Sequence, residues 1–289
     1  MLAIQLAITG LQAGALYALT AVGFSLIFGS TRIFHFAHGA TFVIAAYLFQ
    51  WIFAAGLGFI PGALVAAGGA VAFGLILNRL VYVPIQRDEG SFFTVFVASF
   101  GVGIAVQNLV GMIFGRGYVT VNTPLSRSVK LMDGVYVAPM AWIAIVCMVV
   151  FIGALQLFMR RTHTGMALRA LADNPELVRT FGLNPRTIGA VAFALGSVIV
   201  VPAAIITGAT TGLNPAIGHH VMLISLAATI VGGIGSITGT MLAGLLLGLA
   251  ESMALLVVES QWTEAVTFGI LFAFIILRPS GILGRAHAH

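Results

Sequence analysis

The sequence predicts an all-α protein, a polytopic bundle of transmembrane helices that forms one membrane domain over residues 1–289. The chain is 60% hydrophobic and only 7% charged, with a mean hydropathy of +1.10. A soluble domain carries about 25% charged residues, so this chain could not cover a water-facing surface. The basic residues lie in the gaps between long apolar runs, as membrane-flanking charges do. The net charge of +5 therefore does not indicate nucleic-acid binding.

Charge-free stretches predict about nine membrane segments, with eight to ten as the range. A spanning helix needs about 20 mainly apolar residues. The first stretch has no basic start and no cleavage site, so it is predicted to be a retained span rather than a signal peptide. The segment 221–235 is short, and it is predicted to be either a full span or a re-entrant element. The predicted segments are 4–28, 38–55, 61–83, 92–114, 138–159, 188–209, 221–235, 239–257 and 262–278.

The distribution of basic residues predicts the orientation of the bundle. Under this topology one side holds ten arginines, and the other holds Arg116, Arg127 and Lys130. Loops on the cytoplasmic side of a membrane carry an excess of arginine and lysine. The N-terminus is therefore predicted to lie outside and the C-terminus in the cytoplasm.

The one long hydrophilic stretch, residues 160–187, is predicted to be a cytoplasmic loop that contains a short helix. A capping residue, a proline and an acidic residue mark its start, and a glycine marks its end. Three apolar residues share one face of this helix. Two helical turns are marginal alone, so the helix packs either on its own bundle or on a cytoplasmic partner. The residues involved are Asp173, Asn174, Pro175, Glu176, Leu177, Val178, Phe181 and Gly182.

Four distinctive stretches occur in order along the chain. They are the loop Arg169–Gly182, the turn Gly29–Gly39 that ends in Phe-Ala-His-Gly, the glycine-rich region Val231–Ser252, and the ending Arg278–Gly284. Together they resemble the LivH-type permease subunits of ABC importers for branched-chain amino acids. The sequence departs from the family pattern at His35, where an asparagine is usual, which leaves the role of that turn open.

The resemblance implies a transport subunit rather than an enzyme. Such a permease moves branched-chain or other hydrophobic amino acids into the cytoplasm by alternating access. The implied partners are a second homologous permease, two cytoplasmic ATPase subunits, an extracytoplasmic binding protein and the lipid bilayer of a bacterial inner membrane. No cofactor and no metal is implied. The chain also has no G-x-x-x-x-G-K-[ST] phosphate loop, so ATP hydrolysis is expected from separate subunits.

The resemblance also assigns candidate residues. It implies that the loop helix is the element that couples the permease to its ATPase. The coupling residues are Arg169, Ala170, Asp173, Asn174, Pro175, Glu176, Leu177, Val178, Phe181 and Gly182.

Two glycine-rich turns are candidates for lining the transport pathway, because broken helices offer backbone N–H and C=O groups to the charged ends of a substrate. Both turns join two apolar segments on the same side of the membrane, which hints at a diverged internal repeat. The candidate residues are His35, Phe36, His38 and Gly39 in the first turn, and Gly232, Gly233, Gly235 and Ser236 in the second.

Three alternative functions have weaker support. The sequence 214–216 reads Asn-Pro-Ala, as in aquaporin-like channels, but a second such motif is missing and a helix start explains it better. Glu251 could serve an ion-coupled secondary transporter, although a structural hydrogen bond to a neighbouring backbone group explains it more simply, and Glu259 and Glu264 are predicted to be interfacial. The histidine pairs 35/38 and 219/220 fall on opposite sides of the membrane in this topology. No intramembrane metal site or catalytic residue is therefore predicted.

Overall fold

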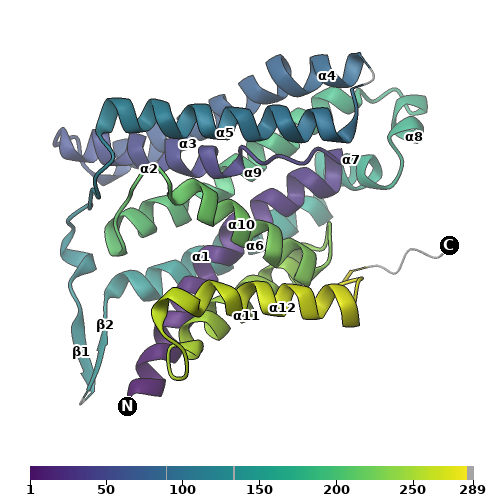
Figure 1. Cartoon of the computed structure of the whole chain (residues 1–289). Coiled ribbons are helices and arrows are strands. Elements are labelled where there is room, and N and C mark those ends of the chain that lie inside the picture. Colours follow the sequence, from purple (N-terminus) through teal and green to yellow (C-terminus); the bar gives the residue numbers. More distant parts are fainter. Residues whose placement is uncertain (89, 133, 285–289) are drawn as a thin grey trace.

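A computed structural model describes residues 1–88, 90–132 and 134–284 of the chain, and these residues are mainly helical (Figure 1). The helices are α1 (Leu2–Thr31), α2 (His38–Ala54), α3 (Phe59–Leu77), η1 (Asn78–Tyr82), α4 (Val83–Arg87), α5 (Phe92–Phe114), η2 (Pro124–Ser126), α6 (Pro139–Arg161), α7 (His163–Asp173), α8 (Pro175–Thr180), α9 (Pro185–Thr210), α10 (Ile217–Gly232), α11 (Ile237–Ala254), η3 (Ser260–Trp262) and α12 (Thr263–Leu277).

Each predicted membrane segment corresponds to a helical stretch. Within the described residues, seven stretches are long and apolar enough to cross a membrane, and α3, η1 and α4 form one of them. The helices α2 and α10 are apolar but have only 17 and 16 residues. At about 1.5 Å per residue, each is shorter than the hydrocarbon core of a typical bilayer. The number of complete crossings stays a prediction.

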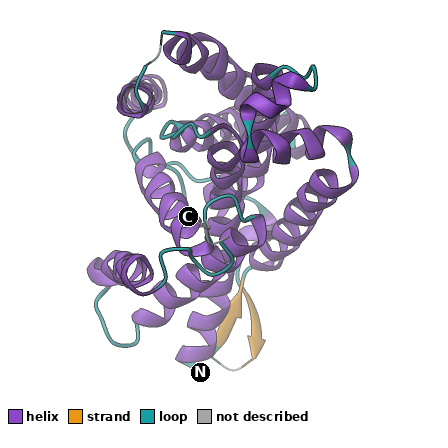
Figure 2. Cartoon of the chain, turned by 90° about the vertical axis from the view of Figure 1, so that its right-hand side faces the viewer, coloured by secondary structure: helices purple, strands orange, loops and turns teal. Residues whose placement is uncertain are grey.

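Two local elements differ from the sequence-based expectation. A small antiparallel hairpin, β1 (Val129–Met132) and β2 (Val135–Val137), follows α5 and lies beside the N-terminal end of α1 (Figure 2). Gln5 of α1 fixes it there, because its side chain accepts from the Tyr136 N–H and donates to the Tyr136 carbonyl, both at 2.8 Å. The hydrophilic stretch 160–187 contains two helices, α7 and α8, rather than one.

Helices α1 and α9 form the centre of the bundle. Most of each is buried, whereas α5 and α12 are largely exposed. The two central helices cross where Gly23 faces Gly196. A Cβ on Gly23 would lie 2.6 Å from the Gly196 carbonyl oxygen, and a Cβ on Gly196 would lie 2.7 Å from the Gly23 carbonyl oxygen. Glycine at both positions therefore permits the close backbone contact.

Helix α2 begins beside the middle of α1 rather than at its end. His38, its first residue, lies with Nε2 3.0 Å from the Thr20 carbonyl oxygen. Thr20 precedes the last residue of α1 by eleven positions, which is about 16 Å along a helix. Residues 32–37 therefore run back along the bundle before the new helix starts.

Helix α10 begins in the same manner, and the two helix starts meet. Six residues separate α9 from α10, as six separate α1 from α2. In each case the first helical N–H donates to a carbonyl three residues earlier, His38 to His35 at 3.0 Å and Ile217 to Asn214 at 3.2 Å. Gly39 and Gly218 face each other with backbones in contact. Segment 214–218 is therefore the structural partner of turn 35–39.

Candidate functional site

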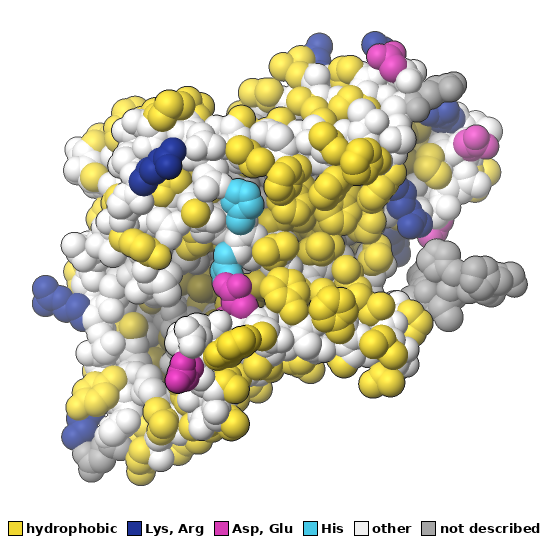
Figure 3. Space-filling view, in the orientation of Figure 1, with side chains coloured by type: hydrophobic (Ala, Val, Ile, Leu, Met, Phe, Trp, Pro, Cys, Tyr) yellow, Lys and Arg dark blue, Asp and Glu magenta, His cyan; other side chains and the backbone are white. Residues whose placement is uncertain are grey.

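The starts of α2 and α10 lie at the bottom of a hollowed, mainly hydrophobic face between α5 and α12 (Figure 3). We define this α5–α12 face by Phe36, Phe100, His219, His220 and Glu264. The first three are in contact, with ring centroids 4.9 Å apart for Phe36 and Phe100 and 6.2 Å apart for Phe100 and His219. The face thus joins residues from both broken-helix starts to α5.

Two adjacent cavities lie along this face. The first is small and apolar, and its walls come from α5 and from the starts of α2 and α10. The second has a volume of about 340 Å³ and is more polar. Gln107 and Pro215 border both. The first cavity is lined by Phe36, Gly39, Ala40, Val43, Gly103, Gln107, Pro215, Gly218 and His219, and the second by Gln107, Asn108, Gly111, Arg116, Tyr118, Asn214, Pro215 and Ala216.

Of the four candidate residues in the first predicted turn, two line a cavity of this site and two do not. Phe36 and Gly39 line the apolar cavity. His35 and His38 are fully buried and point into the bundle instead. Their imidazoles anchor the turn, so their contribution to the site is to position Phe36 and Gly39.

His35 anchors the turn through a chain of hydrogen bonds to α5. Its Nδ1 lies 2.8 Å from the Tyr82 hydroxyl, which donates to Ser99 Oγ at 2.9 Å. Ser99 Oγ also accepts the Ala37 N–H, 2.9 Å away. Because the tyrosine proton goes to Ser99, His35 Nδ1–H donates to the tyrosine oxygen. This chain fixes the start of α2 against α5 and against η1, where Tyr82 lies.

The second predicted turn, Gly232–Ser236, lies elsewhere. It packs against the C-terminal segment, whose Ile282 and Leu283 N–H groups donate to the Val231 and Gly232 carbonyl oxygens at 2.8 and 3.1 Å. Its Gly235 also lies against Gly29 near the end of α1. The structure therefore does not bring the two predicted turns together at one cavity.

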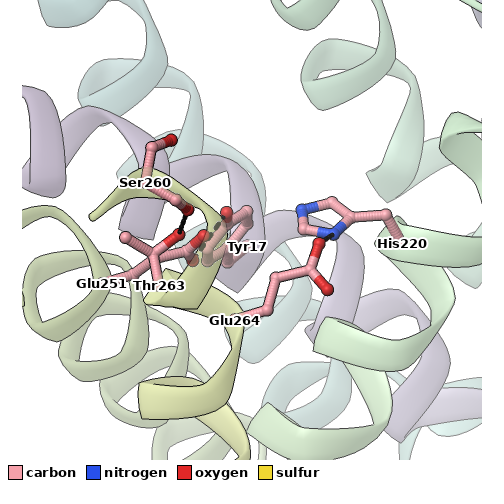
Figure 4. A network of polar contacts seen from close by, with 6 residues as sticks. All are labelled: Tyr17, His220, Glu251, Ser260, Thr263 and Glu264. Atoms are coloured by element: carbon pink, nitrogen blue, oxygen red, sulfur yellow. Dashed lines mark hydrogen bonds and ion pairs between the residues drawn. The ribbon is translucent and has the colours of Figure 1, made fainter. Parts of the chain in front are cut away.

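A polar cluster lies at the α12 side of the α5–α12 face (Figure 4). His220 Nδ1 on α10 donates to Glu264 Oε1 on α12 across 3.0 Å, and both side chains are partly exposed. Tyr17 on α1 donates to Glu251 Oε2 on α11 at 3.0 Å. The Tyr17 ring also meets the His220 ring edge-on, with centroids 6.4 Å apart. Four helices thus place one histidine and two carboxylates together.

The predicted coupling residues form one continuous segment of α7 and α8. Arg169, Ala170 and Asp173 belong to α7, which ends one residue before Asn174. The side chain of Asn174 caps α8 by accepting the N–H groups of residues 176 and 177 at 2.9 and 3.0 Å. Gly182 has a φ of +77°, the left-handed conformation of a helix stop. The predicted start and end of the short helix are confirmed, with Asn174 rather than Asp173 as the cap.

The apolar residues of α8 are divided between the bundle and the exterior. Val178 is buried, whereas Leu177 is 54% exposed and the neighbouring Phe181 is 76% exposed. They border a cavity of about 620 Å³ between α7, α8 and α9, together with apolar residues that include Ile188 and Val191. An open apolar cavity on a hydrophilic loop is typical of a surface that another protein covers.

Several residues of the site were not predicted. Gln107, Asn108 and Arg116 line the polar cavity. The sequence offered a signal for the first two, because two adjacent amide side chains are unusual inside an apolar membrane segment. His219 and His220 were weighed only as metal ligands, and Glu264 only as an interfacial charge. Their association depends on how α10 packs against α12, which no local pattern encodes. Glu251 has a side-chain hydrogen bond, although its partner is a tyrosine rather than the backbone.

Comparison with known proteins gives consistent results. The family model described as "Branched-chain amino acid transport system / permease component" matches residues 6–276. The high-affinity branched-chain amino acid transport system permease protein BraD of Pseudomonas aeruginosa is 32% identical over 98% of this chain and 96% of its own length. LivH of Escherichia coli is 29% identical over the same shares. A probable LivH of Methanocaldococcus jannaschii is 23% identical over 93% of this chain and 89% of its own length.

Proposed function

Because this chain belongs to the family of permease components of branched-chain amino acid transport systems, we propose that it carries branched-chain and related hydrophobic amino acids into the cytoplasm by alternating access. As a member of this family it is a multi-pass membrane transport subunit of an ABC importer and not itself an enzyme. The proposal extends to its complete assembly: a second homologous permease, two cytoplasmic ATPases and an extracytoplasmic binding protein.

The observation that carries the coupling part of this proposal is the exposed apolar surface of α7 and α8. Leu177 and Phe181 border an open cavity although they belong to the hydrophilic stretch between α6 and α9. Burial of apolar area contributes about 25 cal/mol per Å², so a partner that covers these side chains gains binding energy. Asn174 and Gly182 also fix the two ends of α8, so α8 can transmit a movement of the ATPase without unfolding. An ATPase that binds here could move α7 and α8 and, because Gly165 of α7 packs against Met159 of α6, also the bundle.

The position of the second permease is proposed from the α5–α12 face. Glu264 is 61% exposed on it. A charged side chain that faces lipid costs several kcal/mol, so this face suits contact with protein or with a water-filled path. A homologous permease that covers α5 and α12 would enclose the two cavities. The pathway would then pass between the subunits, along Phe36, Gly39 and the starts of α2 and α10.

The proposed orientation has the N-terminus outside and the C-terminus in the cytoplasm, with nine segments in the membrane. In support of it, α7, α8 and the end of α12 lie at one end of the molecule, and the start of α1 and the hairpin lie at the other (Figure 1). The proposed location is the cytoplasmic membrane, since the relatives come from bacteria and from an archaeon.

The test uses the complex reconstituted with its ATPases and binding protein in liposomes that contain ATP. We expect ATP-dependent accumulation of labelled leucine. Glu176→Lys, which reverses a charge on α8, and Asn174→Ala, which removes the cap, are expected to reduce leucine uptake and leucine-stimulated ATP hydrolysis together. Gln261→Ala, at the opposite end of the molecule, is the control. Normal stimulated hydrolysis in both α8 variants would contradict the coupling role, and uptake driven by an ion gradient without ATP would contradict the importer assignment.

A further inference from the structure

We propose that His220 and Glu264 form the site that receives the charged ends of the amino acid during its passage. The Glu264 carboxylate would accept the α-ammonium group, and the His220 imidazole would donate to the α-carboxylate. The substrate would thereby replace the hydrogen bond that the two side chains make to each other. This inference rests on the proposed function, because it names residues that an amino-acid pathway requires.

The chemistry of the pair matches a zwitterion. A hydrogen-bond donor and a carboxylate acceptor lie 3.0 Å apart on different helices. A substrate that carries both an ammonium and a carboxylate can satisfy both partners when they separate. A hydrophobic amino acid loses its water in a narrow apolar path, and unpaired charges there are costly. A pair that can exchange partners removes this cost without leaving any charge unsatisfied.

The location of the pair is also suitable. His220 is the fourth residue of α10, within the first turn of a helix that starts inside the bundle. The positive end of the helix dipole therefore favours a carboxylate beside it. His219, the preceding residue, closes the apolar cavity that Phe36, Val43 and Pro215 line. An aliphatic side chain could lie along this wall while its charged ends remain at the pair.

The pair is not needed to hold α10 against α12. Those helices already share an apolar core in which Val231 packs with Leu271, and Phe268 and Phe274 pack against it. The pair is instead partly open, with the side chains of His220 and Glu264 36% and 61% exposed. The Tyr17 ring lies against His220 while its hydroxyl is bonded to Glu251. Glu251 is only partly exposed, whereas Glu264 is 61% exposed and therefore accessible to a substrate.

The primary test compares Glu264→Gln and His220→Gln with wild type in the reconstituted complex. Loss of a hydrogen bond to a charged group lowers the rate roughly 10- to 100-fold, so leucine uptake should fall by at least about tenfold. Assembly, thermal stability and stimulation of ATP hydrolysis by the leucine-loaded binding protein should change little. Glu259→Gln is the matched control, because that carboxylate is exposed and bonded only locally, to Gln261. Uptake at the wild-type rate in both variants would overturn the proposal.

A swapped variant separates binding from a structural role. Exchanging the residues, His220→Glu with Glu264→His, retains a donor and an acceptor at this position but reverses their order. A purely structural pair would regain full uptake. A substrate site would not, because the carboxylate would then lie at the positive end of α10, where the substrate carboxylate belongs. Full recovery in the swapped variant therefore contradicts the inference.

A chemical experiment tests the site even if a neutral variant assembles poorly. Cys147 is the sole cysteine, so a Cys147→Ala background allows a single thiol at Glu264→Cys. A polar thiol reagent should label this position in the complex, and leucine-loaded binding protein with ATP should slow the labelling severalfold. An unchanged labelling rate would overturn the inference while wild-type leucine uptake leaves the proposed function intact. Failure of the wild-type complex to take up leucine would overturn both.

Discussion

The contact between Gly39 and Gly218 offers a direct test of the fold, because it holds together the two helices that start inside the bundle. In Gly218→Ala the new Cβ would lie 2.8 Å from the Gly39 carbonyl oxygen and 2.9 Å from Val43 Cγ2. Ordinary van der Waals contact begins at 3.4 Å, so the two helix starts would have to separate by about 0.6 Å. The obstacle is backbone, which cannot rotate away as a side chain can.

The expected cost follows from overpacking. Inserting a methyl group into a well-packed interior typically costs about 1–3 kcal/mol. Gly39→Ala is expected to be at least as damaging, since its Cβ would collide with the Gly218 carbonyl oxygen. The separation would also widen the apolar cavity that both glycines line. Leucine uptake by the folded complex should therefore fall as well, in addition to the loss of folded protein that the lower stability causes.

Thermal unfolding in detergent, followed by labelling of the half-buried Cys147 with a thiol-reactive dye, measures the stability. We expect Gly218→Ala to unfold roughly 2–10 °C below wild type. Gly68→Ala on α3 is the matched control, because nothing lies within 4 Å of its new Cβ and alanine favours a helix by about 1 kcal/mol. If Gly218→Ala and Gly68→Ala unfold at the same temperature, the proposed crossing of the two helix starts is wrong.

Two further predictions concern the anchoring of the first turn and of the coupling segment. Tyr82→Phe removes the hydroxyl between His35 and Ser99 and should lower the free energy of unfolding by about 1–3 kcal/mol in the same dye assay. Tyr118 is exposed, so Tyr118→Phe is the control and should leave the stability unchanged. If the two variants are equally stable, the hydrogen-bond chain is refuted. Gly165→Ala places a Cβ 2.6 Å from the Met159 Cα, so α7 must move away from α6 and leucine-stimulated ATP hydrolysis should fall. Gly153→Ala is the control and should retain this stimulation, because nothing lies within 4 Å of its new Cβ. Normal stimulation in both variants would show that the α6–α7 contact does not transmit coupling.

The long apolar helices could be predicted well from the sequence because their signal is local. The segment 92–114 matches α5 at both ends, and helix starts at Asn174 and Asn184 follow from the capping side chains, which accept the expected N–H groups. Short helices were harder to place. The segment 221–235 is displaced from α10 (Ile217–Gly232) because composition does not reveal where a chain turns back inside the bundle.

The candidate site could be predicted only in part, since it depends on contacts between distant segments. The coupling residues lie together because they are contiguous. Phe36 and Gly39 border the apolar cavity, whereas the glycines from 232 to 235 lie at the break between α10 and α11, and the part of both turns in the pathway stays a prediction. A glycine-rich turn indicates close backbone approach without indicating what approaches. His220 and Glu264 are 44 positions apart and acquire their relation only when α10 and α12 pack together.

The contact of the C-terminal segment with the end of α10 has a consequence for biosynthesis. The Val231 and Gly232 carbonyl oxygens accept the N–H groups of Ile282 and Leu283, about fifty positions later in the chain. During translation these carbonyls have no such donors until residues 282 and 283 leave the ribosome. The helix whose first turn carries His220 therefore reaches its final state only after residues 282 and 283 have been made, so a chain terminated at Leu277 would insert its apolar segments but leave this helix without its closing hydrogen bonds.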